Sequence, residues 1–184
     1  MEIEGSVRKH APGGILHALK QYCLTRKIGS FGKGIAIEEN VKFQRYPENI
    51  ALGNYLLIKE GARICPTNPS AKISIGDWTT VGQHTFIFAS YRISIGANCL
   101  IAPFCYLVDG NHGTQKDRLI REQKLMCSPI VIEDDVWLGT GTKILPGVTV
   151  GKGCVVGAGS VVTQDLPSYS LCAGAPAKVI GQRS

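Results

Sequence analysis

A short polar segment in this chain of 184 residues contains the residue types most suited to catalysis, Asp109-Gly110-Asn111-His112-Gly113. Histidine is the side chain whose ordinary pKa lies closest to neutrality, so a positioned His112 could take a proton from a hydroxyl group. Asp109 or Asn111 could orient the imidazole ring, and the segment alone leaves open which of them does so. A loop histidine without a catalytic role is the simpler alternative, which these five residues do not exclude.

The segment interrupts a repeat of six residues. Aliphatic residues recur at every sixth position in the C-terminal part without a miss, at Ile132, Leu138, Ile144, Val150, Val156 and Val162. Six residues would advance an α-helix by about 600°, which would scatter these side chains around its axis, whereas an extended chain keeps them on one side. Glycines after many of these positions can supply turns. The repeat therefore predicts an all-β solenoid built from short strands.

The same spacing recurs upstream, less regularly and with a two-residue slip before Ile95, at Leu52, Ile58, Ile64, Ile75, Val81, Ile87, Ile95, Ile101 and Leu107. Between Leu107 and Ile132 the spacing fails, and the intervening residues are polar and charged. We therefore expect a loop over residues 113–130 that is extruded from the solenoid, because long polar loops on rigid scaffolds commonly carry binding groups.

The ends of a solenoid need caps, since each coil exposes its apolar face until a neighbour covers it. Apolar residues at helical spacing between Pro12 and Gly29 predict a helical capping segment over residues 1–30. The β-helix domain is expected over residues 31–184, with a C-terminal tail at 167–184. Because the first segment is basic, peripheral contact with an anionic membrane is an alternative role for it.

The composition limits the binding partners and the cellular compartment that we expect for this protein. The chain has no apolar run of 18 residues and begins with acidic residues, so we expect a cytoplasmic protein without a membrane span or secretory signal. Seven cysteines without a C-x-x-C pair, and four histidines without close pairing, argue against disulfide and metal sites. The net charge of +6 suits a phosphorylated cofactor, and no basic block interleaved with aromatics predicts a nucleic-acid partner.

Three passages carry a resemblance to a known family: IAPFCYLVDGNHG, PIVIEDDVWLGTGTKILPGVTVGKGCVVGAGSVVTQDLP and AGAPAKVIG. Together they make residues 75–181 similar to the hexapeptide-repeat acyltransferases, in particular the galactoside, maltose and surface-polysaccharide O-acetyltransferases. The resemblance implies a left-handed parallel β-helix and a homotrimer with its active sites between subunits. It also implies acetyl-CoA as the acyl donor, no metal, and His112 as the base that activates a hydroxyl of a sugar or of a polysaccharide of O-antigen or capsule type.

The resemblance also assigns binding positions. It implies that the pantetheine arm of the donor lies along the C-terminal coils, at Trp137, Gly139, Thr140, Ala158, Thr163, Gln164 and Lys178. Gln164 departs from the family, in which a lysine is common, and Lys143 or Lys152 could supply the missing cation. His84 matches a position where related enzymes place a polar group near the acceptor, although a surface histidine at a turn would fit the repeat equally well.

Three other functions remain open at this stage. An N-acetyltransferase of a nucleotide-linked amino sugar would use the same donor and the same fold. A metal-dependent lyase resembling γ-class carbonic anhydrase would need paired histidines, which the chain lacks. A solenoid that serves only as a binding scaffold would not need the segment around His112.

Overall fold

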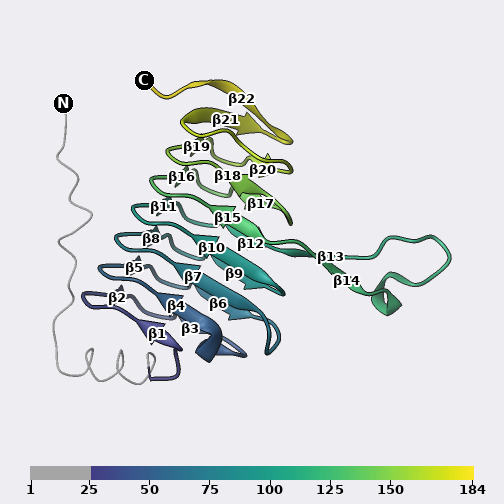
Figure 1. Ribbon diagram of the computed structural model, residues 1–184, viewed down its shortest axis with the longest axis horizontal. Coiled ribbons are helices and arrows are strands. Elements are labelled where there is room, and N and C mark those ends of the chain that lie inside the picture. The colour runs from purple at the N-terminus through teal and green to yellow at the C-terminus, as the bar shows by residue number, and fades with distance from the viewer. Residues whose placement is uncertain (1–25) are drawn as a thin grey trace.

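The computed structural model describes residues 26–184, which form one continuous solenoid with a lateral hairpin (Figure 1). The helical cap predicted for residues 1–30 falls almost entirely outside the described residues. Successive hexapeptides each contribute a short strand, and the chain bends between them, so three parallel sheets form the sides of the solenoid. Among residues 26–184, no helix has the length and hydropathy needed to cross a membrane.

Sheets A, B and C are named here by the order in which the chain first enters them. Sheet A consists of β1 (Ser30–Phe31), β4 (Ile50–Leu52), β7 (Lys72–Ile75), β10 (Arg92–Ile95), β15 (Ile130–Ile132) and β18 (Thr149–Val150). Sheet B consists of β2 (Ala36–Ile37), β5 (Leu57–Ile58), β8 (Thr80–Val81), β11 (Leu100–Ile101), β16 (Trp137–Leu138), β19 (Val155–Val156), β21 (Ser170–Gly174) and β22 (Ala177–Gln182). Sheet C consists of β3 (Lys42–Phe43), β6 (Arg63–Pro66), β9 (Phe86–Ala89), β12 (Tyr106–Val108), β17 (Lys143–Ile144) and β20 (Val161–Val162).

The repeated aliphatic residues form the core, as the spacing predicts. In sheet B, for example, Ile58, Val81, Ile101, Leu138 and Val156 are successive partners in register, and each is no more than 1% exposed. Full burial of one such side chain stabilises the fold by about 1.5–3 kcal/mol. Because each coil adds one residue of this kind to every sheet, the core runs without interruption along the solenoid.

The slip and the gap in the repeat correspond to longer corners. Ile75 pairs with Ile95, twenty positions on, because the step from Ile87 to Ile95 across the corner between β9 and β10 is two residues longer than the repeat of six. Ile95 in turn pairs with Ile132, so sheet A continues directly across the polar interruption. The interruption is therefore an insertion into a coil that still closes.

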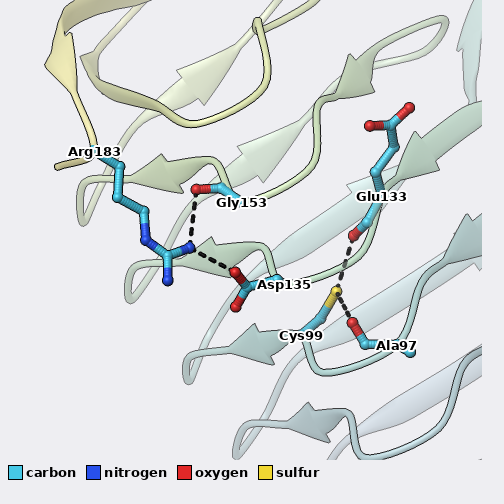
Figure 2. Close-up of polar contacts among 6 residues, drawn as sticks. All are labelled: Ala97, Cys99, Glu133, Asp135, Gly153 and Arg183. Atoms are coloured by element: carbon cyan, nitrogen blue, oxygen red, sulfur yellow. Dashed lines mark hydrogen bonds and ion pairs between the residues drawn. The ribbon is translucent and has the colours of Figure 1, made fainter.

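The C-terminus closes the solenoid with an antiparallel pair, β21 and β22, at the end of sheet B. Just beyond β22, Arg183 forms an ion pair with Asp135 at 2.7 Å and donates a hydrogen bond to the carbonyl oxygen of Gly153 at 3.3 Å (Figure 2). These two residues belong to earlier coils, so the end of the chain is tied to the side of the solenoid.

Candidate active site

The polar insertion is a hairpin that projects from the side of the solenoid (Figure 1). Strand β13 (Gly110–His112) follows directly from β12 and pairs antiparallel with β14 (Leu125–Cys127), with the short 3-10 turn η2 (Ile120–Glu122) between them. At its base, Ser128 N–H donates to the carbonyl oxygen of Asp109 at 2.9 Å. The extruded loop is therefore confirmed, and its two ends lie side by side.

The far part of the hairpin is held by Gln123, which sequence reasoning did not identify. Its Oε1 accepts from Gln115 N–H at 2.9 Å, and its Nε2 donates to the carbonyl oxygens of Gln115 and Arg118 at 2.9 and 3.1 Å. A glutamine in a polar loop gives no signal of this kind in sequence, because its partners are backbone atoms chosen by the course of the loop.

His112 lies at the end of β13, opposite Leu125, and is exposed. Its imidazole makes no hydrogen bond or ion pair with any other residue in the range 26–184. Asn111, opposite Met126, is also exposed, and its side chain is not hydrogen-bonded to His112 within the same range. The ring nitrogens of His112 are thus available to a ligand or to a group from another molecule.

The carboxylate of Asp109 does not lie where it could orient the imidazole ring of His112. Its carboxylate is buried and accepts three backbone N–H groups from the corner between β9 and β10: Ser90 at 2.6 Å, Tyr91 at 2.8 Å and Arg92 at 2.6 Å. Both carboxylate oxygens are occupied by these amides. Asp109 therefore fixes the corner beneath the base of the hairpin, and the structure does not bring its carboxylate to His112.

His84 occupies the corner between sheets B and C, whereas the hairpin leaves from the corner between sheets C and A. It has a positive φ of 52° and stacks on Phe104, with ring centroids 5.4 Å apart and planes 18° from parallel. In the coil before it, Gly61 leaves the space that the imidazole occupies. His84 is exposed, and its described contacts are those of a packed corner residue.

Two of the predicted donor-binding residues, Thr140 and Ala158, stack in the same column of corners as His84. The amide of Gly159, beside Ala158, donates to the carbonyl oxygen of Thr140 at 2.8 Å. Gly141 and Gly159 have φ values of 71° and 70°, and a Cβ built on either would meet no atom within 4 Å. The backbone is therefore bare along these two corners, and a narrow ligand can approach it closely.

The other predicted donor-binding residues lie on several sides of the C-terminal coils. Trp137 is exposed on the outer face of sheet B, between Leu100 and Val155. Gly139 is buried, and a Cβ there would lie 2.6 Å from the nitrogen of Ala158, which gives this glycine a packing role.

Thr163 and Gln164 are exposed at the corner between sheets C and A, on the same corner column as the hairpin. Lys178 is exposed on β22 opposite Ala173. Of the two lysines that could replace a missing cation, Lys143 lies beside the bare corner, with its Nζ 3.2 Å from the carbonyl oxygen of Gly141. Lys152 lies at the corner between sheets A and B, so only Lys143 is near that backbone.

Comparison with known proteins agrees with the repeat and the fold. Residues 129–164 match the family described as bacterial transferase hexapeptide (six repeats). The putative colanic acid biosynthesis acetyltransferase WcaF of Escherichia coli (strain K12) is 36% identical over 72% of this chain and 69% of its own length. The probable acetyltransferase Rv3034c of Mycobacterium tuberculosis is 32% identical over 88% of this chain, which spans about half (52%) of that protein.

A solved structure extends the agreement to three dimensions. The hexapeptide-repeat acetyltransferase VCA0836 of Vibrio cholerae O1 biovar eltor, complexed with acetyl coenzyme A, has a TM-score of 0.65 and 26% sequence identity. The match covers 93% of this chain and 80% of that one. The predicted left-handed parallel β-helix with an extruded loop is therefore confirmed, and the chain belongs to the hexapeptide-repeat acetyltransferase family.

Proposed function

We propose that this chain is an acetyl-CoA-dependent O-acetyltransferase that acts on a hydroxyl of a sugar or surface polysaccharide, with His112 as the general base. The observation that carries the proposal is an exposed imidazole, with both ring nitrogens unengaged within residues 26–184, on a hairpin whose base is fixed to the solenoid. The names of the relatives support an acetyl donor, and WcaF supports a polysaccharide acceptor.

The C-terminal coils suit the donor. The pantetheine arm of acetyl-CoA is narrow and carries amide groups, so it can lie against bare backbone and exchange hydrogen bonds with it. Open corners at Gly141 and Gly159 provide such backbone, next to Thr140 and Ala158. Lys143 and Lys178 are exposed cations on the same coils and can pair with the phosphates of the donor. When bound, the thioester supplies an activated acetyl group.

The proton transfers fall to His112. A ring nitrogen of the neutral imidazole takes the proton from the acceptor hydroxyl as its oxygen attacks the thioester carbonyl carbon. The imidazolium then gives this proton to the departing thiolate of CoA, so the base is restored and no acetyl group is attached to the protein. A well-placed base of this kind supplies a rate factor of about 10²–10⁴.

We further propose a homotrimer in the cytoplasm, where acetyl-CoA is available, with each site completed by the neighbouring subunit. The support is that His112 lies on a projecting hairpin and has no orienting partner among residues 26–184. A group from a second subunit would supply the missing contact and exclude water from the developing charge.

The His112→Ala variant tests the role of the base. We expect kcat for acetyl transfer, followed as release of the free CoA thiol, to fall by about 10²–10⁴ with little change in KM for acetyl-CoA. Lys116→Ala is the matched control, since Lys116 is also exposed on the hairpin, and it should retain activity. Near-wild-type transfer by His112→Ala would show that another group removes the proton.

The acceptor atom is tested separately. Matched sugars that carry either a hydroxyl or an amino group at the same carbon, offered with acetyl-CoA, should give the O-acetyl ester as the main product, identified by NMR. Predominant amide formation would favour the N-acetyltransferase alternative while leaving the role of His112 intact.

A further inference from the structure

The outer face of sheet C carries a cluster of aromatic side chains beside the hairpin. Phe86 and Phe88 project from β9, and Tyr106 projects from the adjacent β12. The Phe86 and Phe88 rings are 5.9 Å apart and nearly parallel, and Tyr106 lies 6.5 and 6.3 Å from them. Tyr106 is 40% exposed and the two phenylalanines are partly exposed, so the three rings form one accessible surface.

The outer face of sheet C also carries basic side chains. The register of sheet C places Lys42, Arg63, Phe86, Tyr106 and Lys143 in one row across the strands. The guanidinium carbon of Arg63 lies 5.3 Å from the centre of the Phe86 ring, and Arg63 has no ion pair within residues 26–184. None of the six strands of sheet C contains an aspartate or glutamate. We call Lys42, Arg63, Phe86, Phe88 and Tyr106 the sheet C strip.

The strip leads to His112. Strand β12 runs through Asp109 into β13, and Val108 is the register partner of Phe88. His112 is four positions after Val108 and six after Tyr106, which correspond to about 13 and 20 Å of fully extended chain. These lengths are the upper limits of the separation, and they leave room for a chain of several sugar rings to contact both the strip and the base.

We propose that the sheet C strip binds the acceptor, and that the acceptor is an acidic oligosaccharide or polysaccharide. This inference rests on the proposed function and specifies its substrate. The C–H faces of sugar rings are apolar and pack on aromatic rings, as at Phe86, Phe88 and Tyr106. The exposed guanidinium of Arg63 binds a carboxylate or phosphate substituent in a bidentate arrangement. A face without acidic residues does not repel such a chain.

Equilibrium binding tests the proposal on the full chain without requiring catalysis. The probes are hexagalacturonate, which carries carboxylates, phosphorylated maltohexaose, and neutral maltohexaose of the same length. We expect at least one anionic hexasaccharide to bind at least tenfold more tightly than the neutral one, and the galacturonate dimer to bind more weakly than the hexamer. The preferred anionic probe identifies the substituent.

Variants locate the binding. Arg63→Gln should weaken the preferred anionic hexasaccharide about tenfold or more and leave maltohexaose unchanged, because it removes a charge-assisted hydrogen bond. Tyr106→Ala should weaken every probe, since it removes stacking area. The matched controls are Lys72→Gln and Tyr55→Ala. Lys72 is an exposed cation on the outer face of sheet A, and Tyr55 is 39% exposed at the corner between sheets A and B. Both control variants should bind the oligosaccharide probes with the affinity of the wild type.

Other outcomes would overturn the proposal and leave the proposed function standing. Equal affinity for neutral and anionic probes, or no effect of Arg63→Gln, would refute the strip as an acidic-glycan site. A change of oligomeric state in Tyr106→Ala, measured by sedimentation, would show that a second copy of the chain covers the strip instead. His112→Ala should bind the probes normally, so loss of transfer and loss of acceptor binding are separable.

Discussion

Removal of the Asp109 carboxylate should loosen the base of the hairpin that carries His112. In Asp109→Ala, the amides of Ser90, Tyr91 and Arg92 lose their acceptor together. A backbone donor left without a partner costs about 1–3 kcal/mol, and the lower figure applies here because this corner is partly open to water. The expected loss is therefore about 3 kcal/mol, or a fall in melting temperature of about 6–12 °C for a chain of this length.

Two further variants test the loss of stability expected for Asp109→Ala. Asp109→Asn keeps one oxygen, which can serve the two amides that share Oδ2, but it turns an NH₂ group toward the third amide, so we expect about half of the loss. Asp165→Ala is the matched control, since Asp165 lies on the same corner column but accepts one N–H group among residues 26–184, from Thr149 at 2.7 Å, and is exposed. Its melting temperature should fall by no more than about 2–4 °C.

Thermal melting measures the loss of global stability, and amide hydrogen exchange shows where in the structure the loss occurs. The amides of Ser90, Tyr91 and Arg92 should exchange faster in Asp109→Ala, and kcat should fall while KM for acetyl-CoA is unchanged. If Asp109→Ala melts within about 2 °C of Asp165→Ala, or if these amides remain protected, then the three hydrogen bonds do not hold the corner as described.

Burial raises the pKa of the Cys99 and Cys105 thiols from an ordinary value of 9.0 to about 11. Between pH 9 and 11 the unfolded chain loses these protons while the folded chain keeps them, so stability should decline with rising pH. The urea midpoint should fall less between pH 8 and 10.5 in a Cys99→Ala/Cys105→Ala variant, and an equal fall would contradict this assignment. In the proposed donor site, Gly159→Asn places a side chain where the corner is open, and asparagine tolerates a positive φ. KM for acetyl-CoA should rise severalfold with kcat preserved, whereas an unchanged KM would indicate that the donor does not pass this corner.

The spacing of apolar residues is sufficient to predict the solenoid because it acts locally and repeats. Each hexapeptide places one aliphatic residue inward and then turns, so Ile132, Leu138 and Ile144 are buried on three successive sides. The same logic locates the insertion, since the register resumes after it.

The site was harder to predict because its contacts join distant residues. Asp109 bonds to amides 17 to 19 residues earlier, and which amides those are depends on the two extra residues of the corner between β9 and β10. Sequence proximity to His112 therefore suggested a role that the geometry does not support. The sheet C strip could have been found, because Phe86 and Tyr106 are 20 positions apart and both precede a core position, which places them in adjacent strands on the outer face.

The closed base of the hairpin has a consequence for how this protein can diversify. Ile93 pairs with Ile130 across the insertion, and the two ends of the insertion meet where Ser128 N–H donates to the carbonyl oxygen of Asp109 at 2.9 Å, next to the β13–β14 pair. A hairpin of different length or sequence can therefore be exchanged at this point without altering the coils on either side. The segment around His112 would then change independently of the coils that we propose to hold the donor.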